Sequence, residues 1–245
     1  MSRTAVEEEV RRRIASFAHW YHRIELAPGV ITPGINDSPQ VLRLLDAMGL
    51  PSDLTGKRVL DLGCRDGFFA FEAERRGALE VVGVDYADPS ATGFPIAAEI
   101  LGSRALYRTM NVYDIDPSSL GTFDVVFFLG LLYHLRDPLW AIDRIRALQR
   151  PGGLLFVESQ LASSPEVRQS PLPLWQFFPG DSLSGDATNC WGPNLAGLVA
   201  AVEECEYRVL ERTGGEARGL VVARAVTDAQ AAAFRKLDRG LRAST

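Results

Sequence analysis

The sequence predicts an α/β fold built on a doubly wound, mostly parallel β-sheet. From Lys57 onward, apolar stretches of strand length alternate with stretches of helical periodicity, which is typical of parallel strands joined by helices. The stretch VLDLGCRDGFF at residues 59–69 joins the first of these strands to a helix through a turn containing glycine, where such sheets bind nucleotides. The last two apolar stretches are joined through TGGEA, which predicts a hairpin and an antiparallel edge.

The predicted strands are short apolar runs bounded by polar or glycine residues, and they number seven. They cover residues 58–62, 80–85, 105–110, 123–129, 153–159, 207–212 and 220–226. Helical periodicity predicts helices over residues 5–21, 39–48, 67–77, 94–101, 138–149, 194–204 and 227–241. The helix over 138–149 should end at the sequence Arg150-Pro151-Gly152-Gly153, a plain stop signal.

The predicted organisation is one domain over residues 1–245 with two additions. Residues 1–50, approximately, form an N-terminal helical lid with a Gly/Pro-rich loop, and residues 160–193 form a long insertion. A loop of that length is usually functional or disordered, and its large aromatic residues argue against disorder. We therefore expect the insertion to cover a substrate site.

Composition narrows the class of protein. With 47% hydrophobic and 23% charged residues the chain resembles an ordinary globular protein, and neither a membrane span nor a secretory signal is evident. Cys64, Cys190 and Cys205 are scattered without metal-ligand spacing, so we expect a cytoplasmic protein with free thiols and no metal site. The net charge of −5 argues against a large nucleic-acid footprint, although a local patch stays possible.

The turn after the first sheet strand predicts the kind of ligand. Its spacing is Asp61-x-Gly63-x-x-x-Gly67, and Arg65 stands where a dinucleotide fingerprint has its second glycine, the one that lets the backbone approach a pyrophosphate. A ligand without phosphates would not need that glycine. Asp85 ends the second strand, where an acid accepts hydrogen bonds from both ribose hydroxyls, and Asn111 with Val112 could read an adenine edge.

This series of motifs resembles the class I S-adenosylmethionine-dependent methyltransferases, from about Lys57 to Tyr207. The motifs are D-x-G-x-x-x-G, the acid ending strand two, FDVV, and PGG before strand five. The resemblance implies a Rossmann-like seven-stranded sheet and S-adenosyl-L-methionine as cofactor. It also implies a cofactor site made of Asp61, Gly63, Gly67, Asp85, Tyr86, Asn111, Val112, Tyr113, Leu129 and Tyr133.

A narrower resemblance comes from LGLLYHLRDPL, LDLGCRDGFF and ARGLVVAR, which are similar to the tRNA wobble-uridine 5-carboxymethoxy (carboxy)methyltransferase family. In that family the residues matching Tyr133 and Arg218 bind an extra carboxylate on the cofactor. A further cofactor-binding lysine lies in the family's N-terminal segment, whereas the residues up to Leu50 contain no lysine here. We therefore expect ordinary S-adenosylmethionine as the donor and a small molecule, such as a natural product, as the acceptor. A tRNA acceptor, a catalytically silent binding or partner protein, and a nicotinamide oxidoreductase stay open as alternatives.

Candidates for catalysis and acceptor binding follow from strand ends and from the insertion. His134 lies just past strand four and suits proton removal because its ordinary pKa of about 6.5 is near working pH, although it could simply cap a turn. The other catalytic candidates are Tyr21 and His22 in a lid hinge and Glu158 at the end of strand five. Acceptor-binding candidates are Trp175, Phe178, Trp191 and Arg218. The oligomeric state is not predicted.

Overall fold

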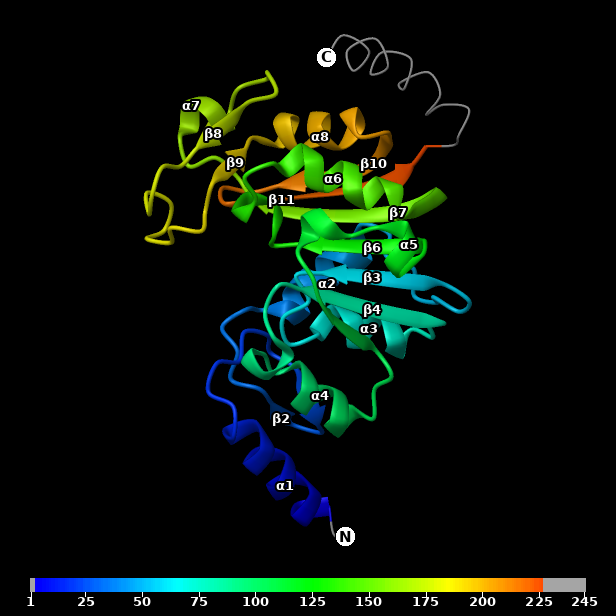
Figure 1. Cartoon of the computed structure of the whole chain (residues 1–245). Helices are drawn as coiled ribbons and strands as arrows, with labels where there is room; N and C mark the ends of the chain where they lie inside the picture. The colour runs from blue at the N-terminus through cyan, green and yellow to red at the C-terminus, as the bar shows by residue number, and fades with distance from the viewer. Residues whose placement is uncertain (1–2, 227–245) are drawn as a thin grey trace. The chain divides into compact units, whose positions relative to one another are not determined.

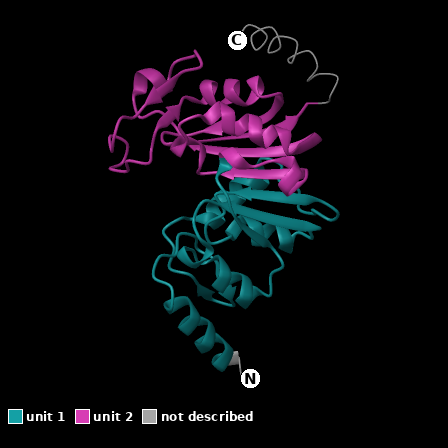
Figure 2. Cartoon of the chain, in the orientation of Figure 1, with its two compact units in different colours: residues 1–112 teal, residues 113–245 magenta. Residues whose placement is uncertain are grey.

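The computed structural model describes residues 3–226, which divide into two compact units, one up to residue 112 and one from residue 113 onward (Figure 2). The helix expected over 227–241 lies outside the described residues. Within the described part, no helix is both long and apolar enough to cross a membrane. The arrangement as one domain with a lid and a covering insertion stays a prediction.

The main sheet has seven strands in the order β10-β11-β7-β6-β3-β4-β5 (Figure 1). The pairs β3–β4, β4–β5 and β6–β7 are parallel, whereas β11 is antiparallel to both β7 and β10. The predicted α/β class and the antiparallel edge hairpin are therefore confirmed. The strands are β3 Arg58–Leu62, β4 Glu80–Asp85, β5 Leu106–Thr109, β6 Phe123–Leu129, β7 Gln149–Gln160, β10 Tyr207–Gly214 and β11 Arg218–Ala225.

The first unit surrounds strands β3, β4 and β5 with helices and carries a small hairpin near its N-terminus. Proline at the start of α4 and Gly102 in the left-handed conformation after its end set the limits of that helix. The further elements of this unit are α1 Arg3–Ala15, β1 Glu25–Ala27, β2 Val30–Ile31, α2 Ser38–Ala47, α3 Phe68–Arg75, the 3₁₀ turn η1 Pro89–Ala91 and α4 Phe94–Leu101.

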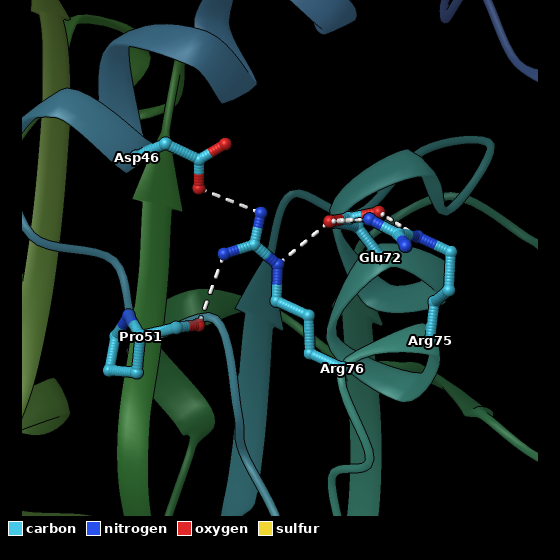
Figure 3. A network of polar contacts seen from close by, with 5 residues as sticks. All are labelled: Asp46, Pro51, Glu72, Arg75 and Arg76. Carbon is cyan, nitrogen blue, oxygen red and sulfur yellow. Dashed lines mark hydrogen bonds and ion pairs between the residues drawn. The ribbon is translucent and has the colours of Figure 1, made fainter.

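A polar network ties helix α2 to helix α3 (Figure 3). The Arg76 guanidinium donates to Asp46 at 2.7 Å, to the Pro51 carbonyl at 3.0 Å and to Glu72 at 2.7 Å. Glu72 also accepts two hydrogen bonds from Arg75. Because the Arg76 side chain is only 7% exposed, these hydrogen bonds replace the water it has lost. The network fixes the C-terminal end of the helix whose first turn follows Gly67.

Helix α1 ends at Ala15, six residues before the predicted end at residue 21. The chain beyond it has tertiary partners: the Trp20 indole N–H donates to the Ile14 carbonyl at 3.0 Å, and the backbone N–H groups of Tyr21 and His22 donate to the carboxylate of Asp66. An N–H that bonds outward is not available for a helix. Residues 16–21, which were predicted as helix, are therefore turn and irregular chain.

The second unit contains β6, β7, β10 and β11. Strand β6 is almost wholly buried and reads FDVVFFL, as expected for a parallel strand covered on both faces. Helix α8 packs on β10 and contacts α6. The further elements are the 3₁₀ turns η2 Val112–Asp114 and η3 Leu132–His134, with α5 Pro117–Leu120, α6 Pro138–Ala147, α7 Pro165–Arg168, β8 Trp175–Phe177, β9 Trp191–Pro193 and α8 Leu195–Glu204.

The predicted stop of α6 at Arg150-Pro151-Gly152-Gly153 is wrong. The helix ends at Ala147, and β7 already begins at Gln149. Phe123 pairs with Gln149 but Val125 pairs with Leu154, so the proline and glycines form an irregularity inside the strand. Proline and glycine in a strand often mark such a bulge, which periodicity alone does not reveal.

Candidate functional site

The turn between β3 and α3 holds three residues in the left-handed region of the backbone. Gly63 and Gly67 have φ of 74° and 90°, and Arg65 between them has φ of 46°. That conformation costs a residue with a side chain about 1–2 kcal/mol, so glycine suits the outer two positions. A side chain at position 67 would also lie 2.6 Å from the Phe94 ring. The backbone conformation and the contact with Phe94 thus explain why glycine occupies positions 63 and 67. That these glycines also leave space for a ligand stays a prediction.

Two buried carboxylates lie at the carboxyl ends of β3 and β4. Asp85 is 3% exposed and accepts hydrogen bonds from the backbone N–H groups of Arg65 and Ala87, both at 3.0 Å. Asp61 is 2% exposed and accepts one from Ala70 at 3.1 Å. Burial raises the pKa of Asp61 to about 7; the Ala70 hydrogen bond opposes this and the Asp85 charge adds to it. A cationic ligand at this edge would favour the ionised form.

The raised pKa of Asp61 predicts that this residue's contribution to stability falls as pH rises. Because the folded-state pKa of about 7 lies above the ordinary 3.8, the folded protein keeps a proton that the unfolded chain has already lost. The contribution of Asp61 to the free energy of unfolding should therefore decrease from about pH 4 to about pH 7. Asp61→Asn cannot ionise, so the free energy of unfolding of the native protein, minus that of the variant, should decrease over this range. Urea unfolding of both proteins across this range measures the difference, and an equal pH dependence would contradict the prediction.

The other predicted cofactor residues differ in exposure. Tyr86 is 77% exposed beside Asp85, Asn111 is exposed, and Val112 is buried. In the second unit the Tyr113 hydroxyl accepts a hydrogen bond from the Asp137 N–H at 2.9 Å. The exposed Tyr86 ring, next to the carboxylate predicted to bind the ribose, could stack on the adenine base. The buried Val112 could offer mainly its backbone groups. Leu129 is half-buried at the end of β6.

In the second unit, Arg218 at the start of β11 is held by Glu158 near the end of β7. The guanidinium donates from Nε to Oε1 of Glu158 and from Nη2 to Oε2, a two-point pairing. Its third nitrogen, Nη1, contacts Gln160 at 3.5 Å. The guanidinium carbon lies 4.9 Å from the centre of the Tyr133 ring. Each guanidinium nitrogen of Arg218 therefore already has a partner.

His134 has the tautomer that a general base needs. Its Nδ1 lies 3.3 Å from the Thr188 carbonyl oxygen and 3.0 Å from the Thr188 hydroxyl. A carbonyl can only accept, and the hydroxyl donates to Asp186 at 2.6 Å, so both contacts place the proton on Nδ1. Nε2 is then the atom with a lone pair. Burial lowers the pKa of His134, more than the Thr188 contact and the Asp186 charge raise it.

The insertion is anchored on the segment that carries Tyr133 and His134. The Cys190 N–H donates to the Tyr133 carbonyl at 2.8 Å, and the Trp191 indole N–H donates to the Arg136 carbonyl at 3.1 Å. Loops of this length are usually functional, for example as active-site lids, or disordered. The predicted cover and the predicted base therefore lie together in one unit.

The aromatic residues of the insertion have different surroundings. Trp191 is half-buried and contacts the rings of Trp175 and Phe177. Phe178 is only 5% exposed, and a Cβ at Gly192 would lie 2.9 Å from its ring. Its role in acceptor binding stays a prediction, but its burial also supports the internal packing of the insertion.

The lid candidates Tyr21 and His22 lie in the first unit. His22 is 4% exposed, and burial lowers its pKa to about 4, against the charge of Asp66. A neutral imidazole with so low a pKa is a weak base at neutral pH. Its Nδ1 has no hydrogen-bond partner. Tyr21 is half-buried, and its hydroxyl accepts a hydrogen bond from Asn36 at 3.3 Å.

Asp66 and Thr188 were not predicted as functional residues. Asp66 precedes Gly67 in the turn, and an acid there can capture backbone N–H groups, but the sequence does not say which. Thr188 is distant in the sequence from His134, and only the folded insertion brings them together. Among residues 3–226, no group of three or more His, Cys, Asp or Glu side chains is placed to hold a metal ion.

Fold and site define a Rossmann-like α/β protein with acids at the ends of two adjacent parallel strands. The chain belongs to the methyltransferase-domain family, whose model matches residues 36–211. The predicted methyltransferase class is therefore confirmed.

The curated relatives are tRNA-modifying enzymes by name. A tRNA U34 carboxymethyltransferase from Campylobacter hominis is 32% identical over 107 residues, which are 44% of this chain and 37% of that protein. The enzyme of the same name from Klebsiella pneumoniae is 29% identical over 156 residues, covering 64% of this chain and 45% of that protein. The chain thus matches less than half the length of these relatives.

Solved structures share the fold at low identity. The N-terminal domain of EvdMO1, crystallised in the presence of SAH and D-fucose, has a TM-score of 0.62 and 20% identity, covering 92% of this chain and 97% of that one. The 1,6-didemethyltoxoflavin-N1-methyltransferase of Burkholderia thailandensis has a TM-score of 0.57 and 18% identity, covering 77% of each chain. The [4+2]-cyclase SpnF has a TM-score of 0.60 and 16% identity, covering 91% and 94%. These likenesses show the fold.

Proposed function

We propose that this protein is an S-adenosylmethionine-dependent methyltransferase acting on a small-molecule acceptor in the cytoplasm. Support for the donor comes from the family and from two buried carboxylates, Asp61 and Asp85, at adjacent strand ends. The donor carries a sulfonium and an ammonium group, and buried acids are suited to a cationic ligand. SAH is named in the crystal structures of both EvdMO1 N-terminal domain forms and of the toxoflavin methyltransferase. The residues present therefore fit this cofactor.

The observation that carries the proposed small-molecule acceptor is the pairing of Arg218 with Glu158. In the tRNA-modifying family that the sequence resembles, the matching arginine binds the carboxylate of a carboxylated donor. Here Glu158 occupies the Nε–Nη2 edge of the guanidinium and Gln160 contacts Nη1, so a second carboxylate would compete with both residues for Arg218. This pairing, together with the net charge of −5, supports the small-molecule proposal. The toxoflavin enzyme, a small-molecule methyltransferase by name, shares the fold.

The bound donor would supply a methyl group already activated by the sulfonium. The chain's own residues then have to align the acceptor, remove its proton and exclude water. Alignment can contribute roughly 7–11 kcal/mol, and a positioned base about 10²–10⁴-fold in rate. We assign proton removal to Nε2 of His134 and the exclusion of water to the insertion. Trp175 and Trp191, which are half-buried and in contact, would offer apolar surface to the acceptor.

Direct binding measurements test the donor. Calorimetry should show binding of S-adenosylhomocysteine and weak or no binding of NAD, because Arg65 replaces the glycine that a pyrophosphate requires. Tight NAD binding without S-adenosylhomocysteine binding would contradict the proposal. Binding without turnover across a wide screen of acceptors would instead support a silent binding protein, since one fold can serve many activities.

The Arg218–Glu158 pair predicts which donor is preferred. The plain donor should turn over faster than carboxy-S-adenosylmethionine in the native protein. Glu158→Gln removes the competing charge, so the ratio of the two kcat/KM values should move toward the carboxylated donor by about tenfold or more, as loss of a charged hydrogen bond does. Glu166→Gln, an exposed acid in the same unit, serves as the control. Faster turnover of the carboxylated donor by the native protein would contradict this and favour the tRNA alternative.

The curated relatives favour a second candidate, a tRNA wobble-uridine methyl- or carboxymethyltransferase. This candidate requires tRNA binding that weakens steeply with salt, because phosphate contacts release counterions. Titration with tRNA at two salt concentrations distinguishes it from the small-molecule proposal.

A further inference from the structure

Asp66 joins the cofactor turn to the N-terminal segment. Its carboxylate is 1% exposed and accepts three backbone hydrogen bonds: from Tyr21 at 2.6 Å, from His22 at 2.8 Å and from Gly93 at 2.7 Å. The first two come from the segment of residues 19–36, here called the strap, and the third from the residue before helix α4. One side chain of the turn thus satisfies backbone groups on two other segments of the first unit.

Hydrogen bonds between its own residues hold the strap together. The Thr32 hydroxyl donates to the His22 carbonyl at 2.6 Å and accepts from the Ile24 N–H at 2.8 Å. The Asn36 N–H donates to the Tyr21 carbonyl at 2.9 Å. Gly34 packs against His22 so closely that a Cβ would lie 2.2 Å from the His22 carbonyl oxygen. These contacts tie the residues of the strap to one another, and Tyr21 and His22 bond to Asp66 of the turn.

Further contacts link the strap to the same turn and to α4. The Arg65 guanidinium lies 5.9 Å from the centre of the Tyr21 ring. The His22 ring contacts the rings of Phe68 and Phe69 at the start of α3. Trp20 is buried against Gly93, where a Cβ would lie 2.3 Å from its ring. The left-handed Arg65 is thus flanked by Asp85, which accepts from its N–H, and by the strap.

We propose that Asp66 is a positioning residue that couples the strap to donor binding. It holds the turn of residues 63–67 in its binding conformation by fixing that turn to the strap, so ordering of the strap and affinity for the donor depend on each other. Such coupling is reciprocal. If loosening the strap weakens the binding of the donor, the bound donor must favour the ordered strap by the same factor. This inference rests on the proposed donor, S-adenosylmethionine.

The test uses Asp66→Asn in the full chain. An amide has one acceptor oxygen in place of two, so it cannot accept from all three N–H groups, and its NH₂ group repels one of them. The dissociation constant of S-adenosylhomocysteine, measured by calorimetry, should rise about tenfold or more, within the usual range of coupling. The KM of the acceptor should change little. Hydrogen exchange at the amides of Tyr21 and His22 should accelerate in the variant without ligand.

A second variant keeps the turn itself intact. Thr32→Val preserves side-chain volume but removes two hydrogen bonds inside the strap. Thr32→Val should also weaken the binding of S-adenosylhomocysteine. In the native protein, bound S-adenosylhomocysteine should slow amide hydrogen exchange across residues 19–36. Asp88→Asn is the matched control, because Asp88 is an exposed acid in the same unit that accepts from a backbone N–H; its affinity should stay native.

The outcomes separate the two proposals. If the native protein does not bind S-adenosylhomocysteine, the proposed function fails before the strap is tested. If the native protein binds it, while Thr32→Val speeds exchange in the strap and leaves the dissociation constant unchanged, strap and turn are independent and the inference is overturned. The same conclusion follows if Asp66→Asn folds, loses protection of Tyr21 and His22, and binds with native affinity.

Discussion

Replacing His134 by alanine is expected to lower kcat by about 10²–10⁴-fold, the contribution typical of a positioned general base. The structure supports this role because Nδ1 carries its proton toward Thr188, which leaves Nε2 as the acceptor. The affinity for S-adenosylhomocysteine should stay near native, since the assigned ribose carboxylate, Asp85, lies on another strand. Single-turnover kinetics with calorimetry on the same samples would measure both effects.

The pH profile gives an independent check on His134. A base acts only when unprotonated, and burial lowers the pKa of His134 below its ordinary value of 6.5. The rate should therefore stay high through neutral pH and fall only below that ordinary value. A variant with near-native turnover and an unchanged profile would make His134 a structural turn residue. Glu158 or Tyr21 would then be the next candidate, since His22, with a pKa of about 4, is a weaker base.

Replacing Asp85 by alanine is expected to weaken the binding of S-adenosylhomocysteine by a few kcal/mol, at about 1.5–3 kcal/mol for each hydrogen bond lost to a charged group. The carboxylate is buried and already bound by Arg65 and Ala87, which fixes its orientation. Calorimetry measures the change, and Asp88→Ala, the exposed neighbouring acid, is the control.

Two effects of Asp85→Ala have to be separated. Loss of the Arg65 hydrogen bond also releases the turn, so the thermal stability of the variant without ligand is measured in parallel. A folded variant that binds S-adenosylhomocysteine as tightly as the native protein would remove Asp85 from the cofactor site.

The sheet was predictable because its strands carry dense local signals. The predicted bounds of β3, β4 and β6 equal the observed ones, since each is an apolar run with a polar or glycine residue at its end. Helix α1 was predicted six residues too long because the chain after Ala15 makes tertiary contacts, such as the Tyr21 hydrogen bond to Asp66, 45 positions away along the chain. The small hairpins β1–β2 and β8–β9 were missed because three-residue and two-residue strands have no periodicity to detect.

The candidate site was partly predictable for the same reason. Asp61, Gly63 and Gly67 stand in one motif at the end of β3, and Asp85 ends the next strand, so sequence position alone indicates that they lie at one sheet edge. Partners distant in the sequence were not predictable: Thr188 beside His134, Glu158 on Arg218, and Asp66 on the strap. These contacts depend on how a long insertion and an N-terminal segment fold back, which no local pattern encodes.

Transfer of a labelled methyl group tests the central claim most directly. The native protein is incubated with S-adenosylmethionine labelled at the methyl group and with a cell extract, and the products are separated into RNA, protein and small-molecule fractions. The account predicts label in the small-molecule fraction, with His134→Ala reducing it strongly. Label that enters the tRNA fraction, and not the small molecules, would contradict the account.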